Sequence, residues 1–326
     1  MIYTAEAVTR AHPDKVCDQI SDAVLDHCLT HDPYARVAVE TLGGHGQVTL
    51  MGEVTTVVPL DNATCEHIAR EVYRDNGYTD DISVSVHISQ QSPEIGAGVD
   101  NEGAGDQGVM VGYATDETVT FMPLELHLAR LLTRAMGKHD GKAQVTVEHG
   151  RVTNVVTSLC ESDDMSDVEL DAIFSEEIAQ YIDGPSDRVW LKNPNGVWKL
   201  GGFAADTGLT GRKIVIDAYG PRVQVGGGAF SGKDATKVDR SAAYMARKIA
   251  VDYVRKGAHQ ATVTLAYAIG HPYPLAAVAH VDGREELVTG YDLRPQAIIE
   301  QLGLRAPIYY KTAQSGHFGN GFAWDM

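Results

Sequence analysis

The spacing of apolar and polar residues predicts strand pairs, each followed by a helix, along most of the chain. Residues 36–41 and 47–56 alternate apolar and polar positions on either side of a glycine-rich turn, which is typical of a β-hairpin. Asp61 then precedes a helical pattern that stops near Gly77, and a further strand is expected over 83–88. These elements form a first α+β unit.

Two later stretches repeat this order. Residues 144–148 and 151–159 predict a second hairpin, and an apolar stripe predicts a helix over 166–182. The third stretch has predicted strands at 213–219, 261–268 and 275–281, a helix over 238–257, and a last helix capped by Asp292 with Pro295 in its first turn. The expected fold is therefore α+β, with sheets covered on one face by helices.

The N-terminal residues 12–15 (HPDK) stand at the start of a further helical pattern. Pro13 suits a helix N-terminus, where unpaired N–H groups and the helix dipole favour anions. Asp14 is either a favourable acid of the first turn or a magnesium ligand beside a phosphate. His12 is either a helix cap or a donor to an oxygen that develops charge. The spacing alone leaves both pairs of alternatives open.

A glycine-rich stretch at 226–234 (GGGAFSGKD) carries the strongest local signal. From Gly227 it matches G-x-x-x-x-G-K, but Asp234 stands where a phosphate-binding P-loop has the Ser or Thr that ligates magnesium. A true P-loop is disfavoured for that reason. Glycine N–H groups beside Lys233 still suit an anion, and the alternative is a mobile glycine loop with solvated lysines.

Composition and charge narrow the classes of partner. The 326 residues carry a net charge of −17, which disfavours nucleic acid and anionic membranes as partners. Residues 199–256 nevertheless hold 11 Lys and Arg against 5 Asp and Glu, while the remainder holds 16 against 39. Such a cationic island fits a small polyanion such as a nucleoside triphosphate. The chain has no apolar run of membrane-spanning length and no secretory signal, and its four cysteines are scattered, so a cytoplasmic protein with reduced thiols is expected.

Taken in order, these motifs resemble the S-adenosylmethionine synthetase (methionine adenosyltransferase) family over almost the whole chain. The motifs that carry the resemblance are 12–15 (HPDK), 18–23 (DQISDA), 103–108 (GAGDQG), 208–213 (GLTGRK), 226–234 (GGGAFSGKD), 237–244 (KVDRSAAY) and 316–319 (GHFG). The resemblance implies three similar α+β domains, over 1–98, 103–203 and 205–326, in a pseudo-threefold arrangement. It also implies a homodimer or homotetramer with active sites at the subunit interface.

The same resemblance implies a reaction and the residues that perform it. The substrates would be ATP, L-methionine and water, and the products S-adenosylmethionine, phosphate and diphosphate. The implied catalytic residues are His12, Lys142, Arg212, Lys213 and Lys233. The implied ATP contacts are His12, Asp140, Lys142, Trp198, Asp206, Arg212, Lys213, Ala229 and Lys233, and the implied methionine contacts are Glu53, Gln91, Asp106, Asp206 and Lys237. The implied cofactors are Mg²⁺, at Asp14 and Asp239, and K⁺, at Glu40.

Some positions depart from the family's pattern. Arg10 and Ala11 replace the acid and the glycine that usually precede the HPDK run, and the segments 91–106 and 121–142 are shorter than usual. These departures leave a second hypothesis, a catalytically silent ATP- or polyphosphate-binding subunit that regulates a partner. A third, a P-loop phosphotransferase, is disfavoured because Asp234 replaces the Ser or Thr of its motif.

Overall fold

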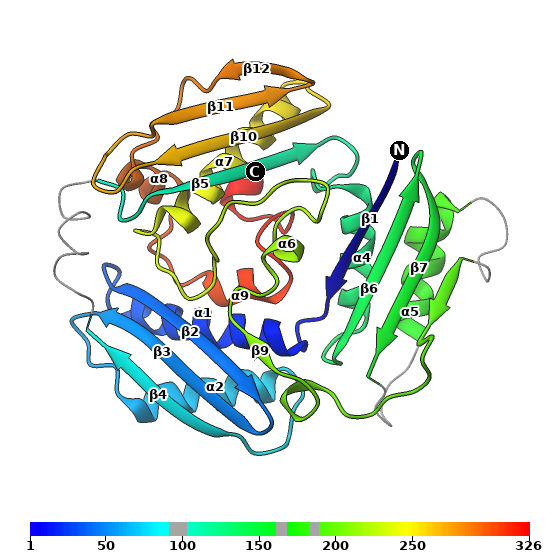
Figure 1. Cartoon of the computed structure of the whole chain (residues 1–326), viewed down its shortest axis with the longest axis horizontal. Coiled ribbons are helices and arrows are strands. Elements are labelled where there is room, and N and C mark those ends of the chain that lie inside the picture. The colour runs from blue at the N-terminus through cyan, green and yellow to red at the C-terminus, as the bar shows by residue number, and fades with distance from the viewer. Residues whose placement is uncertain (91–102, 161–167, 183–188) are drawn as a thin grey trace.

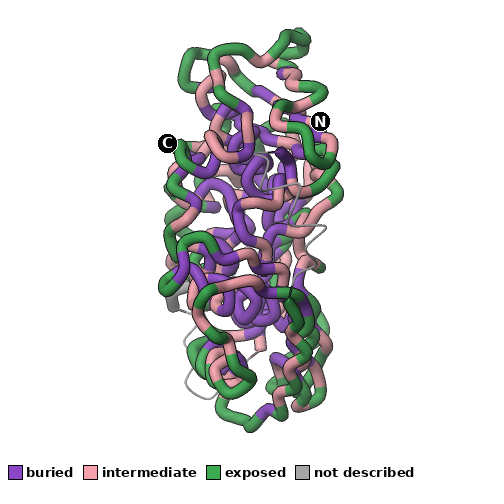
Figure 2. The backbone as a smooth tube through the Cα atoms, turned by 90° about the vertical axis from the view of Figure 1, so that its left-hand side faces the viewer, coloured by how far each residue is buried: buried purple, intermediate pink, exposed green. Residues whose placement is uncertain are grey.

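In the described part of the chain, three four-stranded sheets surround the centre of the molecule, and helices lie at the centre as well as behind the sheets (Figure 1). The computed structural model describes residues 1–90, 103–160, 168–182 and 189–326. Seen from the side, the folded molecule is narrow, and its buried residues are concentrated in the middle (Figure 2). The expected arrangement of sheets covered on one face by helices is therefore observed.

The first sheet contains the predicted N-terminal hairpin. Its strands are β2 (Arg36–Gly44), β3 (Gln47–Thr55), β4 (Ser83–Ser89) and β9 (Gly208–Leu209), and helices α1 (Pro13–His31) and α2 (Asn62–Asp75) lie behind it. The Asp61 side chain accepts a hydrogen bond from the main-chain N–H of Thr64 at 2.8 Å. This bond confirms the predicted N-cap, since it satisfies a donor that the first helical turn leaves unpaired.

The second sheet contains the second predicted hairpin. Its strands are β1 (Ile2–Val8), β6 (Gly141–Glu148), β7 (Arg151–Leu159) and β8 (Trp190–Lys192), with helix α4 (Leu124–Ala135) packed against it. The helix expected over 166–182 is divided into α5 (Val168–Ile173), a π-helical turn (Phe174–Ile178) and a 3₁₀ turn (Ala179–Tyr181). Residues 166 and 167 lie outside the described part of the chain.

The third sheet is built mainly from the C-terminal part of the chain. Its strands are β5 (Gly108–Thr115), β10 (Gln260–Tyr267), β11 (Ala276–Val281) and β12 (Arg284–Leu287), covered by helix α7 (Val238–Arg255). Helices α8 (Pro295–Leu302) and α9 (Tyr309–Gln314) follow, and short 3₁₀ turns lie at Gly202–Ala204 and Ala323–Asp325. Among the residues described, every helix is too short or too polar to cross a lipid bilayer.

In each sheet, one edge strand comes from a part of the sequence distant from the other strands of that sheet. Strand β1 pairs antiparallel with β6, β5 pairs antiparallel with β10, and β9 pairs antiparallel with β2. The N-terminal segment thus completes the second sheet, the central segment completes the third, and the C-terminal segment completes the first. Membership of the sheets therefore crosses the sequence ranges 1–98, 103–203 and 205–326, which remain a prediction of domain boundaries.

Two local expectations are wrong. The stretch 213–219, predicted as a strand, forms the short helix α6 (Ile214–Asp217), in which the N–H of Asp217 donates to the carbonyl of Lys213 at 2.8 Å. The buried Asp217 carboxylate pairs with Lys15 of α1 at 2.8 Å, so a tertiary contact outweighs the local preference of Ile and Val for strands. The predicted cap Asp292 is also wrong, because the N-cap of α8 is Arg294. The Asp292 carboxylate instead accepts a hydrogen bond from the N–H of Arg294, in a turn that precedes the helix.

Candidate active site

His12 caps the N-terminus of α1. Its Nδ1 accepts a hydrogen bond from the main-chain N–H of Asp14 at 3.2 Å, and only 4% of the residue is exposed. Burial, with the charges of Lys213 and Lys142, lowers the pKa of His12 to about 3. The ring is therefore neutral, and because Nδ1 is an acceptor, its proton is on Nε2. His12 is a cap whose second nitrogen can still donate.

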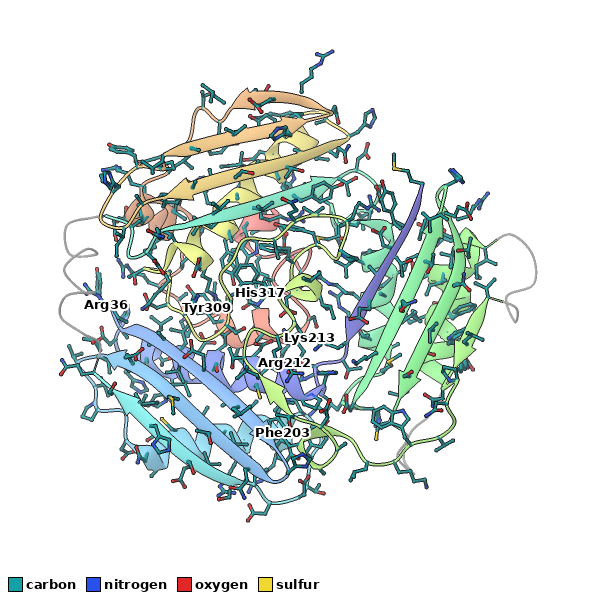
Figure 3. All side chains as sticks on the ribbon, viewed as in Figure 1. Arg36, Phe203, Arg212, Lys213, Tyr309 and His317 are labelled. Atoms are coloured by element: carbon teal, nitrogen blue, oxygen red, sulfur yellow. The ribbon has the colours of Figure 1, made fainter. Side chains whose placement is uncertain are left out.

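Asp14 is a fully buried carboxylate that fixes two cations. Its Oδ1 accepts from the N–H of Leu209 at 2.9 Å and lies 3.3 Å from Nε of Arg212, while its Oδ2 pairs with Lys213. Burial acts to raise the pKa of Asp14, but the hydrogen bonds from Lys213 and Leu209 hold it below the usual value. Strand β9 thus positions the cations of the 208–213 motif at the start of α1, near the centre of the three sheets (Figure 3).

Residues of the second sheet lie close to His12. Lys142 is exposed on β6, and Asp140 precedes that strand and accepts from the N–H of Gly202 at 3.0 Å. Burial raises the pKa of Asp140 to about 6. Trp198 forms a β-bridge with Cys160, whose N–H donates to the Asp140 carbonyl. The charge of Asp206 also acts on His12 and Asp140. We call the following residues the His12 group: His12, Asp14, Asp140, Lys142, Asp206, Arg212 and Lys213.

A second charged group lies where the glycine-rich loop meets β2 and β3. Nζ of Lys233 lies 2.7 Å from Oδ2 of Asp239, which is in the first turn of α7. Burial raises the pKa of Glu40. The positive charge of Lys233 acts to lower that pKa, and the negative charge of Glu53 acts to raise it further. Lys237 pairs with Asp234. We call the following residues the Lys233 group: Glu40, Glu53, Lys233, Lys237 and Asp239.

Two carboxylates hold the glycine-rich loop in place, a role that the sequence alone does not indicate. Asp22 of α1 accepts from the N–H of Gly232 at 2.8 Å and forms a two-pronged pair with the fully buried Arg240 at 2.6 and 2.8 Å. Asp234 accepts from the N–H of Val37 on β2 at 2.7 Å. Asp234 thus connects the loop to a strand. In the sequence, the only sign of this role is that an acid replaces the Ser or Thr of the P-loop motif.

The loop also differs from a P-loop in its setting. The described residues just before it contain no strand, because 214–217 is helical, and α7 begins only at Val238. A Cβ on Gly228 would lie 2.0 Å from the carboxyl carbon of Asp239, so the main chain passes directly against that carboxylate. The loop therefore positions Lys233 and Asp239 rather than a phosphate beneath a helix N-terminus.

The two groups are separate within one chain. No hydrogen bond or ion pair joins them in the described ranges. The ion pairs of Asp14 stay within the His12 group, and Lys233 and Lys237 pair with carboxylates of α7 and of the glycine-rich loop. Asp14 and Asp22 are eight residues apart on α1, so about 12 Å of helix lies between the His12 group and the anchored loop. Ala229 of the glycine-rich loop contacts the 208–213 motif, because a Cβ on Gly211 would lie 2.7 Å from the Cβ of Ala229. Ala229 therefore lies between the two groups.

Two implied methionine contacts lie at the margin of the described structure. Gln91 is outside the described residues. Asp106 is exposed, and its carboxylate accepts from the N–H of Gln107 at 2.7 Å. Two residues further on, a Cβ on Gly108 would lie 3.4 Å from Oδ1 of Asp239. Asp106 therefore belongs to the surroundings of the Lys233 group.

The carboxylates of both groups have the chemistry of hard-cation ligands. Oxygen atoms of Asp and Glu are what Mg²⁺ and K⁺ prefer, and Mg²⁺ commonly combines one or two carboxylates with phosphate oxygens. Across the described residues, no three His, Cys, Asp or Glu side chains converge on one point. Asp14 and Asp239 instead each hold a lysine, so a magnesium ion there needs phosphate oxygens as further ligands.

Comparison with known proteins shows the family of this chain. Models of the N-terminal, central and C-terminal domains of S-adenosylmethionine synthetase match residues 1–93, 101–196 and 200–326. The chain belongs to the S-adenosylmethionine synthetase family. It is 44% identical to the S-adenosylmethionine synthase of Desulforudis audaxviator, over 98% of this chain and 93% of that protein, and 42% identical to that of Brachyspira hyodysenteriae, over 99% and 95%.

Membership of the S-adenosylmethionine synthetase family confirms the expected α+β fold and the expected enzyme class, a methionine adenosyltransferase. The alignment with the Desulforudis protein runs over 372 positions, 46 more than the 326 residues of this chain. Segments of that synthase therefore have no counterpart here, which agrees with the expectation that parts of the chain are shortened. The roles of individual residues stay predictions.

Proposed function

We propose that this chain makes S-adenosylmethionine from ATP and L-methionine and then hydrolyses the bound triphosphate to phosphate and diphosphate. One observation carries the proposal: a buried carboxylate holds Arg212 and Lys213 beside a neutral His12. A second carboxylate, that of Asp239, holds Lys233 in the Lys233 group. Fixed cations of this kind are what a leaving triphosphate requires. Family membership supports the same substrates.

The chemistry follows from where charge develops. The methionine sulfur is a neutral nucleophile, so its attack on the ribose C5′ needs no general base. The bond from C5′ to the triphosphate oxygen breaks with both electrons going to oxygen, and negative charge grows there. Cations held in place before the reaction stabilise that charge more in the transition state than in the substrate. Nε2–H of His12 is placed in this proposal as a donor to the same oxygen.

The second step uses the same charges. After sulfur attack, the triphosphate stays bound among the cations, and water adds to phosphorus as a P–O bond breaks to give phosphate and diphosphate. In this proposal Asp14 and Asp239 hold Mg²⁺ and Glu40 holds K⁺. Bound Mg²⁺ supplies neutralisation of the phosphate charge. The lysines and the arginine orient the phosphates and hold them out of bulk water.

The working site in this proposal lies between two copies of the chain. Along β2 and β3, Glu40 and Glu53 share the open face of the sheet with Leu42 and Met51, following the two-residue period. Further exposed apolar side chains on strands of all three sheets are Ile2, Val109 and Leu209. Apolar surface around a charged group favours burial against a second copy, which would bring one chain's Lys233 group to the other's His12 group. We place the enzyme in the cytoplasm.

The product assay tests the reaction. Purified protein incubated with ATP, L-methionine, Mg²⁺ and K⁺ should form S-adenosylmethionine, phosphate and diphosphate. A folded, metal-supplied preparation that binds ATP without turnover would instead support the silent-subunit hypothesis.

Isotope labelling separates the proposal from phosphoryl transfer. Oxygen-18 placed in the bridge between C5′ and the α-phosphorus should leave with the phosphate products, because the carbon–oxygen bond breaks. Label retained in a nucleoside product would show attack at phosphorus and contradict the proposal.

A further inference from the structure

A cavity of about 290 Å³ lies among α1, α4, α6 and the residues that follow α9. Its lining includes Arg130 and Arg134 of α4, Lys15 of α1, Asp217 of α6 and Ser315 after α9. None of the described residues predicted to bind ATP, methionine or metal lines it. The cavity is therefore separate from both charged groups.

Arg130 lines the cavity and forms no ion pair with a carboxylate among the described residues. Its guanidinium donates to the carbonyls of Ile216, Asp217 and Ala218 at 2.8 to 3.1 Å, and to that of Phe318. Only 5% of the residue is exposed, and burial lowers its pKa to about 10. Carbonyl oxygens satisfy its N–H groups but do not neutralise it, so the buried positive charge is costly.

Arg134 lies one helical turn later and, unlike Arg130, is exposed. Its side chain donates to the amide oxygen of Asn320, which is neutral, and burial lowers its pKa. In the parts of the chain that the structure describes, neither Arg130 nor Arg134 forms an ion pair. Two like charges therefore face one cavity, which destabilises it unless an anion is bound.

The other three cations of the cavity are paired with three carboxylates. Lys15 pairs with Asp217 at 2.8 Å and Asp18 at 3.2 Å, and Asp75 pairs with Lys138 at 3.1 Å and with Arg10. Five cations thus line the cavity, and three carboxylates either line it or pair with those cations. The excess of two positive charges equals the charge of a phosphate dianion.

We propose that this cavity binds a phosphate group, held between the guanidinium groups of Arg130 and Arg134. Because carbonyl oxygens already accept from both terminal nitrogens of Arg130, Arg130 contributes mainly its charge. The exposed guanidinium of Arg134 can form the two-pronged hydrogen bonds that match a tetrahedral oxyanion. The occupant is inorganic phosphate, diphosphate or a small phosphate monoester, since the cavity is near the lower end of the size of ligand pockets.

The first experiment measures binding by calorimetry on the full chain, with phosphate, diphosphate and glycerol 3-phosphate as separate probes. The background variant Lys213→Gln/Lys233→Gln removes cations from both charged groups, so that the remaining binding reports the cavity. Adding Arg134→Gln and Lys138→Gln should weaken that binding about tenfold or more, because charge-assisted hydrogen bonds are lost. The control changes Lys256→Gln and Arg284→Gln, two exposed cations elsewhere, and should leave it unchanged.

Which probe binds most tightly identifies the source of the phosphate group. Binding that persists unchanged in Arg134→Gln/Lys138→Gln, or that vanishes entirely in the background variant, would overturn the proposal. A second measurement does not depend on any variant: crystals of the unaltered chain grown with selenate, a tetrahedral dianion, should show selenium between Arg130 and Arg134. Selenium found only at the two charged groups would also overturn it.

Discussion

Two variants, each inactive alone, should restore activity when combined in one dimer. Lys213→Gln damages the His12 group, and Lys233→Gln damages the Lys233 group. In the proposed dimer, each active site takes one group from each chain. A heterodimer of the two variants then has one site with both lesions and one site with neither.

The size of the effect follows from this arrangement. Removing one fixed cation at a developing oxyanion typically lowers kcat about 10²–10³-fold, so each homodimer should retain about 1% or less. Because one of the two sites in the heterodimer is intact, its kcat per dimer should be about half that of the unaltered protein. A site built within a single chain would leave both sites of the heterodimer damaged, at about 1%.

The assay uses two affinity tags. Co-expressed chains are purified over both tags in sequence, so that only heterodimers remain, and S-adenosylmethionine formation is measured. The matched control pairs Lys213→Gln with His12→Asn, two lesions of the same group, which leave no intact site in either arrangement. Equal, low activity of the test and control heterodimers would refute the division of the site between chains.

Three further outcomes are expected. Burial lowers the pKa of His12 from its ordinary value to about 3, so between pH 6.5 and 3 the unfolded chain binds a proton that the folded chain does not, and stability falls as the pH falls. Chemical denaturation at pH 5 and pH 7.5 should show a smaller pH dependence for His12→Asn, which keeps a capping acceptor. Asp22→Asn leaves the fully buried Arg240 unpaired and should lower the free energy of unfolding by about 3–5 kcal/mol, with part recovered in Asp22→Asn/Arg240→Met. Gly228→Ala should reduce S-adenosylmethionine formation because its Cβ meets the Asp239 carboxylate, whereas Gly227→Ala, with nothing within 4 Å, should not. Comparable activities of the two glycine variants would contradict this account of the loop.

Elements set by local chemistry could be predicted from the sequence. The Asp61 cap, the two hairpins at glycine turns and helix α7 depend on residues close together in the chain, and all are confirmed. Helix α6 was predicted wrongly because the ion pair of Asp217 with Lys15 joins residues 202 positions apart. No local pattern reports such a partner.

The candidate site was predicted in a similar way. The resemblance to the family implies the charged residues of the site, and their roles stay predictions. It does not give their division into two groups, which depends on how β9 and the glycine-rich loop meet α1. The anchoring role of Asp234 was also missed, because only its N–H partner on β2 reveals it.

The exchange of edge strands constrains how the chain can fold during synthesis. Strand β1 pairs with β6, which begins about 140 residues later, so at about 5–20 residues per second its partner emerges roughly 7–28 s afterwards. Strand β5 likewise pairs with β10, which is synthesised much later. Each of the three described sheets is complete only after a later segment has left the ribosome. Until then strand β1 is an unpaired strand that a chaperone or a neighbouring nascent chain could bind.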